Sequence, residues 1–207
     1  GGGQLGRMLS VAATRLGFRC HIFEPSVNPP AADVAHSLTC ASYEDEKALS
    51  EFAAAVDVIT YEFENIPTSA LDTLENLRPI RPGREALRIS QDRATEKDFL
   101  NNLGLKTAPY AAIETFEDLN NAIETISTPA ILKTRRFGYD RKGQARLTTL
   151  DDVNKAFEAM QGQASVLEGF VQFSHEVSVI GARTASGDVA CFDPGENVHR
   201  NGILHTT

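Results

Sequence analysis

The chain has 207 residues and a formal net charge of −8, and 42% of its residues are hydrophobic and 23% charged. This balance is ordinary for a globular protein with a real core of one or two domains, and it argues against general nucleic-acid binding, which needs a basic surface. No apolar run could cross a membrane, no signal-peptide pattern occurs, and the three cysteines lack metal spacing, so we expect a cytoplasmic protein with a small-molecule partner.

The first 80 residues alternate between helical and strand-like patterns. Apolar residues recur at helical spacing over residues 5–16, and Gly17 supplies a stop. The following segments are read as a strand (18–24), a helix (44–56), a strand (57–63) and a helix with Pro67 near its start (67–77). This βαβ alternation predicts an α/β fold with a parallel sheet and helices on its faces.

The chain opens on the glycine-rich stretch GGGQLGRM. Gly1, Gly3 and Gly6 fit the G-x-G-x-x-G pattern of a dinucleotide-binding turn, and Glu24 follows at about the distance of a ribose-binding acid. A strand normally feeds such a turn, so we expect a strand before the first residue. On these residues alone, a nicotinamide-dependent oxidoreductase domain is a possible interpretation.

The composition changes near residue 80. The segment 78–91 is rich in proline and arginine and predicts a boundary, and residues 92–104 form a helical pattern ending at Gly104. Beyond residue 107, strand-rich hairpins and two helices, over 115–126 and 151–160, predict a smaller α+β unit.

The densest chemical signal follows a predicted strand over residues 130–133. Lys133 stands at its end as an exposed charge, further basic residues follow up to Lys142, and Gly143 begins a hairpin return. Such a loop can hold phosphates through backbone N–H groups and cationic side chains, although a solvated basic hairpin tip fits the spacing equally well.

Two acids form a second candidate. Glu168 ends an apolar strand, and Glu176 lies in an alternating strand, so they bracket a turn. Carboxylates at strand ends could bind the hydroxyls of a nucleoside, but taken alone the pair is better explained as surface acids on edge strands.

Six ordered blocks run through the chain: GGGQLGRM, YEFENIP, DRATEKDFL, KTRRFGYDRKGQ, EGFVQFSHEVSVIGAR and ENVHRNGILHTT. Together they resemble the 5-(carboxyamino)imidazole ribonucleotide synthetase family of the ATP-grasp superfamily. The resemblance implies a Rossmann-like N-terminal domain (1–92), an ATP-grasp small lid domain (93–167) and the beginning of the larger ATP-grasp domain (168–207). It also implies that the glycine turn marks a fold and does not bind a dinucleotide.

The resemblance implies a reaction in which bicarbonate is joined to the amine of aminoimidazole ribonucleotide while ATP becomes ADP and phosphate. ATP and Mg²⁺ are the implied cofactors, and a homodimer is the implied assembly. In the family the metal ligands come after the last of the six blocks, so we expect this sequence to be the N-terminal portion of a longer enzyme, without carboxylation activity by itself. The runners-up are another ATP-grasp ribonucleotide ligase or transformylase.

Residue roles carry over where the types match. The resemblance assigns three loop positions to catalysis, namely Tyr139, Asp140 and Lys142. It assigns ATP binding to Arg93, Lys133, Gly138, Tyr139, Asp140, Arg141, Lys142, Gly143, Gln144, Glu168, Gly169, Phe170, Val171, Glu176 and His199. The ribonucleotide candidates, carried over from a sister enzyme, are Gln4, Leu5 and Glu62; helix capping would explain Gln4 equally well, and a solvated strand end Glu62. Arg141 departs from the family, which usually has glycine there.

Overall fold

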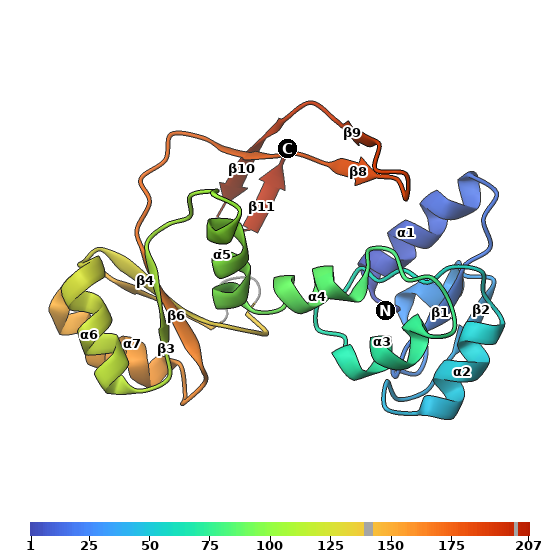
Figure 1. Cartoon of the computed structure of the whole chain (residues 1–207), viewed down its shortest axis with the longest axis horizontal. Coiled ribbons are helices and arrows are strands. Elements are labelled where there is room, and N and C mark those ends of the chain that lie inside the picture. The colour runs from blue at the N-terminus through green and yellow to red at the C-terminus, as the bar shows by residue number, and fades with distance from the viewer. Residues whose placement is uncertain (139–142, 201–202) are drawn as a thin grey trace. The chain divides into compact units, whose positions relative to one another are not determined.

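The computed structural model describes residues 1–138, 143–200 and 203–207 (Figure 1). The chain forms two compact units, Gly1–Phe99 and Leu100–Thr207, and each is described by itself. None of the helices within the described ranges is both long enough and apolar enough to span a bilayer.

The first unit combines parallel strand pairing with helices, as the alternating pattern predicts. Strand β1 pairs in parallel with β2, and a separate parallel bridge joins Ile59 to Ile80. The strand expected over 57–63 is therefore reduced to one bridge. The elements are α1 (Gln4–Arg15), β1 (His21–Phe23), the 3-10 helix η1 (Pro30–Asp33), β2 (Ser37–Thr39), α2 (Glu46–Ala54), α3 (Thr68–Glu75) and α4 (Arg84–Ser90), followed by α5 (Arg93–Asn102), which continues into the second unit.

Helix α1 ends where its sequence predicts, but it buries a different face. Gly17 has a φ of +86° and its N–H donates to the Thr14 carbonyl, the backbone geometry that glycine adopts most easily after a helix. The buried residues are the small Gly6 and Ser10, while the large apolar residues that marked the helix are exposed, with Leu5 62% exposed. A Cβ on Gly6 would meet the Gly1 carbonyl oxygen, so this face of α1 lies against the glycine turn.

The core of the first unit joins β1 to α2, α3 and α4. Asp45 caps α2 by accepting a hydrogen bond from the Ala48 N–H at 2.9 Å. Helix α4 was not expected, because the prolines and glycine just before it read as a boundary. The shared cluster is apolar and contains Phe23, Leu49, Phe52, Ala53, Ile59, Ile66, Ala70, Leu71, Leu74, Ile80 and Leu87.

The second unit contains a four-stranded antiparallel sheet in the order β3-β6-β4-β5. Strand β4 alternates strictly, with Ala130, Leu132 and Thr134 buried and Ile131 and Lys133 less buried. One face of the sheet is therefore turned toward the helices, and the opposite face, called the polar face here, carries Lys133, Glu168 and Arg146 beside Ile131 and Val166. Its elements are β3 (Tyr110–Ile113), α6 (Phe116–Ile126), β4 (Ala130–Thr134), β5 (Gln144–Leu147), η2 (Leu150–Asp152), α7 (Val153–Ala159) and β6 (Ser165–Gly169).

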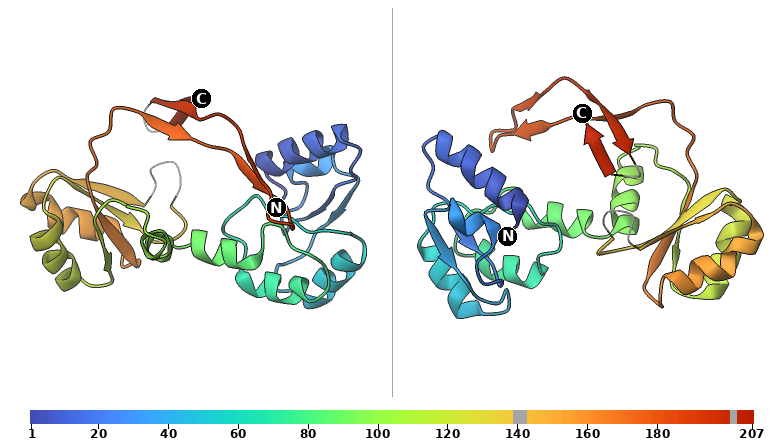
Figure 2. Two further views of the ribbon diagram at one scale, coloured as in Figure 1. Left: turned by 45° about the horizontal axis from the view of Figure 1, so that its top comes forward. Right: turned by 180° about the vertical axis from the view of Figure 1, so that it is seen from behind.

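Helices α6 and α7 cover the apolar face, on the same side of the sheet in every view (Figures 1 and 2). In α6 the buried Leu119, Ala122 and Ile123 stand at helical spacing, as predicted. A capping box begins α6: the Asp118 N–H donates to Thr115 Oγ1, and the Thr115 N–H donates to the Asp118 carboxylate. Hydrogen bonds to the Asp118 carboxylate from Thr115, first of all from its backbone N–H, and from the Glu114 N–H lower the pKa of Asp118.

The chain then continues into short antiparallel strands. β7 (Glu176–Ser178), β10 (Gly195–Arg200) and β11 (Ile203–Thr206) form one sheet, and β8 (Gly181–Arg183) pairs with β9 (Val189–Cys191). Every residue of β7, β8, β9 and β11 is exposed. These strands contribute nothing to the apolar cluster under α6 and α7.

Candidate nucleotide site

Lys133 lies on the polar face of the four-stranded sheet. The alternation of β4 turns its side chain away from the helices, and its Nζ donates to Glu168 Oε2 at 2.7 Å. The Lys133 side chain is only 24% exposed, so the expectation of an exposed charge was wrong. The reason is the register, which places a carboxylate from β6 within reach.

Glu168 is largely buried and lies on an inner strand. Strand β6 lies between β3 and β4, and Glu168 stands opposite Tyr110 on one side and Ile131 on the other. Its side chain is 12% exposed. The interpretation of Glu168 as a surface acid on an edge strand is therefore wrong. A carboxylate this buried needs a partner, and Lys133 provides one.

Gly143 closes the base of the basic segment beside Lys133. Its φ is +68°, and a Cβ there would lie 2.5 Å from Thr134 Oγ1. The Thr134 N–H donates to the Gly143 carbonyl at 2.8 Å, which joins the two ends of the segment. Gly138 lies before the gap in the description, and the expected site residues Tyr139, Asp140, Arg141 and Lys142 lie outside the described residues.

The segment after β6 is held by two backbone hydrogen bonds. The Gly169 N–H donates to the Pro109 carbonyl at 2.8 Å, and the Phe170 N–H donates to the Pro129 carbonyl at 3.0 Å. Phe170 is 39% exposed, and Val171 is exposed as well. Of the predicted hinge residues, Glu168 and Gly169 end β6, and Phe170 and Val171 follow it as exposed apolar residues.

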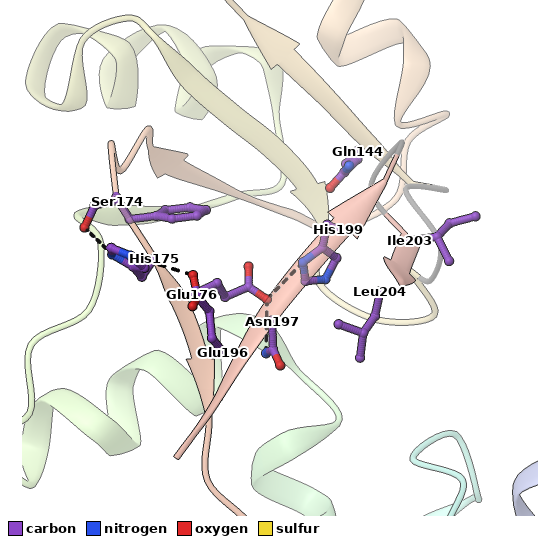
Figure 3. A pocket seen from close by; sticks show the side chains of 10 residues that line it. Gln144, Ser174, His175, Glu176, Glu196, Asn197, His199, Ile203 and Leu204 are labelled. Atoms are coloured by element: carbon purple, nitrogen blue, oxygen red, sulfur yellow. Dashed lines mark hydrogen bonds and ion pairs between the residues drawn. The ribbon is translucent and has the colours of Figure 1, made fainter. Parts of the chain in front are cut away.

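A pocket of about 720 Å³ lies in the second unit, lined by one residue of β5, by the segment just before β7, and by residues of β7, β10 and β11 (Figure 3). Two predicted site residues meet in it: the Glu176 Oε1 atom lies 3.4 Å from His199 Nδ1. Asn197 Nδ2 donates to the same oxygen at 3.5 Å. The lining residues are Gln144, Phe173, Ser174, His175, Glu176, Glu196, Asn197, His199, Ile203 and Leu204.

Sequence reasoning missed several residues of this region. His175 Nε2 lies 3.7 Å from Glu196 Oε1 in the pocket, and the guanidinium of Arg146 lies over the Phe170 ring at 4.5 Å from its centre. Arg146 follows Gln144 by two residues on β5, so alternation from a residue already singled out could have found it. No comparable signal marks His175 or Glu196, because only the pairing of β7 with β10 brings these two residues together.

The glycine turn of the first unit gathers the ribonucleotide candidates. A Cβ on Gly6 would lie 2.7 Å from the backbone carbonyl oxygen of Gly1, so Gly6 requires glycine, and a Cβ on Gly1 would lie 2.6 Å from Glu62 Oε1 at the end of that side chain. Gln4 and Leu5 begin α1 directly after this turn and are exposed. The turn therefore brings Glu62 to the N-terminal end of the helix that carries the other two.

Glu24 supports the turn through its carboxylate. It accepts hydrogen bonds from the Gly2 N–H at 2.8 Å and from the Ser26 N–H and hydroxyl. Burial raises the pKa of Glu24, but these hydrogen bonds outweigh burial and lower it overall. Burial also raises the pKa of the nearby Tyr43 phenol, and the charges of Glu24 and Glu62 raise it further. A carboxylate engaged with its own turn is poorly placed to bind the ribose of a dinucleotide.

Arg93 is the first residue of α5 and belongs to the first unit. Asp92 precedes it and accepts hydrogen bonds from the backbone N–H groups of Ala94 and Thr95, which caps the helix. Arg93 is therefore the first residue of a helix whose N-terminus is capped by Asp92.

Two family models match the chain. The ribonucleotide synthetase pre-ATP-grasp domain matches residues 1–91, and the ATP-grasp domain matches residues 98–207. Over its whole length the chain is 53% identical to the N5-carboxyaminoimidazole ribonucleotide synthase of Brucella melitensis, of which it covers 58%. The chain thus spans little more than half the length of this curated relative.

Two solved structures are similar across 99% of the chain. N5-carboxyaminoimidazole synthetase from Staphylococcus aureus, complexed with ADP, has a TM-score of 0.93 and 39% identity, and the match covers 55% of that chain. The synthase from Aspergillus clavatus, in complex with ADP and 5-aminoimidazole ribonucleotide, has a TM-score of 0.86 and 26% identity, and the match covers 54% of it. On the match of its residues 98–207, this chain belongs to the ATP-grasp family.

Proposed function

We propose that this chain is the nucleotide- and substrate-binding part of an enzyme that carboxylates 5-aminoimidazole ribonucleotide with bicarbonate at the expense of ATP. The observation that carries the proposal is the 53% identity over the whole chain to a synthase of this activity. The products would be N5-carboxyaminoimidazole ribonucleotide, ADP and phosphate, a step of purine biosynthesis.

The chemistry requires activation of bicarbonate. Hydroxide is a poor leaving group, so the amine cannot displace it directly from bicarbonate. Transfer of the γ-phosphoryl group of ATP to a bicarbonate oxygen gives carboxyphosphate, from which the amine displaces phosphate. Carboxyphosphate is short-lived in water, and a domain that closes over the site would exclude solvent during this step.

The nucleotide is proposed to lie along the polar face of the four-stranded sheet. Lys133, together with Arg93 and the segment from Gly138 to Gln144, would contact the phosphates. The segment from Glu168 to Val171 would meet adenine, as a strand end with backbone groups near its exposed edge can. Support comes from the position of Lys133 and Glu168, which share this face and contact each other at 2.7 Å.

The ribose end is proposed to enter the pocket of the second unit. Glu176 would accept hydrogen bonds from the ribose hydroxyls, and His199 would lie beside it. Both line the pocket, and their contact at 3.4 Å supports a shared role. A carboxylate that accepts from hydroxyls forms stronger hydrogen bonds than a neutral acceptor would.

The ribonucleotide is proposed to bind Gln4, Leu5 and Glu62, and Tyr139, Asp140 and Lys142 would face the reacting groups. The support for the first three is their convergence on the glycine turn. Mg²⁺ would accompany ATP as a hard cation that prefers oxygen ligands. Within the described ranges no group of three or more His, Cys, Asp or Glu side chains comes together.

The domain boundaries also stay part of the proposal: a Rossmann-like domain over 1–92, a lid over 93–167 and the beginning of a larger domain over 168–207. We also propose that the enzyme is a cytoplasmic homodimer that binds neither nucleic acid nor membranes. The alternatives are another ATP-grasp ribonucleotide ligase or transformylase.

The test compares the chain with the product of the complete reading frame from which it comes. Each is assayed for ADP formation with ATP, Mg²⁺ and bicarbonate, with aminoimidazole ribonucleotide or a panel of other amine ribonucleotides. We expect the complete product to form ADP only when aminoimidazole ribonucleotide and bicarbonate are both present, and the chain alone to bind nucleotide without turnover. Turnover with a different amine would favour the runner-up, and stabilisation by NAD in place of ATP would refute both.

A further inference from the structure

Arg146 shares the polar sheet face with the proposed nucleotide-binding residues. It stands on β5 opposite Ile131, and Ile131 stands opposite Glu168 on β6. Residues directly opposite one another in paired strands point to the same face. Arg146, Ile131 and Glu168 therefore form one row across the sheet, one register step from Lys133.

The Arg146 side chain reaches along this face to the segment after β6. Its guanidinium carbon lies 4.5 Å from the centre of the Phe170 ring, within the range of a cation–π interaction. The Phe170 backbone N–H is already fixed to the Pro129 carbonyl, so the remaining freedom of this residue is in its half-exposed ring. The guanidinium stacked on that ring restrains its rotation.

This contact joins two parts of the proposed site. Gly143 and Gln144, which end the basic segment, lead directly into β5, and Arg146 follows two residues later. Phe170 lies in the segment proposed to meet the base. A restrained segment loses less conformational entropy when a ligand binds than a freely moving one does.

We infer that Arg146 is a positioning residue, which acts through Phe170 to hold the base-binding segment in place for the nucleotide. The inference rests on the proposed nucleotide function of the same face. Arg146 would not touch the phosphates, and its removal should weaken binding of the nucleoside part alone. A cation–π contact at a partly exposed site corresponds to about a two- to fivefold change in a dissociation constant.

The experiment measures binding of ADP and of inorganic tripolyphosphate to the product of the complete reading frame by calorimetry. Arg146→Ala should raise the dissociation constant of ADP by about two- to fivefold and leave that of tripolyphosphate unchanged. Arg146→Lys should fall between, because an ammonium cannot stack as a planar guanidinium does. Arg183→Ala, an exposed arginine on β8, is the matched control and should change neither constant.

A second arm tests whether Arg146 acts through the ring. In a Phe170→Leu background, Arg146→Ala should have little further effect on ADP binding, because the contact it removes is already lost. Equal weakening of ADP and tripolyphosphate, or the full effect of Arg146→Ala in the Phe170→Leu background, would overturn the inference.

Lys133→Met separates this failure from that of the proposed function. If Lys133→Met weakens both ligands while Arg146→Ala affects neither, the nucleotide site stands and the role of Arg146 is wrong. If ADP does not bind the unaltered protein, or Lys133→Met leaves both constants unchanged, the proposed nucleotide site itself is wrong.

Discussion

Lys133→Met should affect folding as well as nucleotide binding. The change removes the ammonium that donates to Glu168 Oε2 at 2.7 Å, beside a carboxylate that is 12% exposed. Breaking a fully buried ion pair from one side costs about 3–5 kcal/mol, and a hydrogen bond to a charged group contributes roughly 1.5–3 kcal/mol. Because the Lys133 side chain is 24% exposed, we expect the free energy of unfolding to fall by about 1–3 kcal/mol, less than for a fully buried ion pair.

Urea denaturation and thermal melting without nucleotide measure this loss. For a domain of about 100 residues each kcal/mol lowers Tm by roughly 4–8 °C. The double variant Lys133→Met, Glu168→Gln should recover more than half of the loss, because the carboxylate is then replaced by a neutral amide. A single variant as stable as the unaltered protein would show that the pair makes no net contribution, and a double variant less stable than the single one would refute the proposed cause.

Gly143→Ala should destabilise the second unit by at least about 1 kcal/mol, because alanine is strained at a φ of +68° and its Cβ would meet Thr134 Oγ1; a melting temperature equal to that of the unaltered protein would contradict this. Glu176→Gln should weaken ATP binding by about 1–3 kcal/mol with little effect on 2′,3′-dideoxy-ATP, and equal weakening of both ligands by calorimetry would argue against a ribose contact. Burial, reinforced by His36, lowers the pKa of His21, so the folded state resists protonation that the unfolded chain accepts. The stability that neutral His21 allows should therefore be fully present above pH of about 6.5 and be lost as the pH falls below that value. Between pH 7.5 and 5.5 the urea midpoint should fall less for His21→Gln than for the unaltered protein. Equal falls for the two proteins would assign the pH dependence to other groups.

Sequence patterns predicted the fold best where one residue type repeats at a clear period. The apolar spacing of α6 and the glycine after α1 both specified local geometry, and the structure has them. Helix α4 was missed because Pro82 and Gly83 precede it and read as a boundary. The strand around Ile59 was predicted too long, because its pairing depends on Ile80, a distant segment.

The site was less predictable, since its contacts join residues far apart in the sequence. Lys133 and Glu168 are 35 residues apart, and only the register of β4 with β6 brings them together. The position of Arg146 over Phe170 likewise depends on three strands packing in order. Residue types suggested phosphate and ribose chemistry, but the partner of each charge followed from strand pairing.

The alternation of strand β4 separates two kinds of selection along five consecutive residues. Ala130, Leu132 and Thr134 face the helices and are at most 3% exposed, whereas Ile131 and Lys133 face the opposite side. In a saturation mutagenesis experiment that records protein abundance and catalytic output separately, substitutions at Ala130, Leu132 and Thr134 should lower mainly abundance. Substitutions at Lys133 should lower output per molecule beyond the abundance that is lost with the Glu168 contact. Substitutions on the polar face of β4 could therefore change which ligand binds while the helix-facing core residues stay the same.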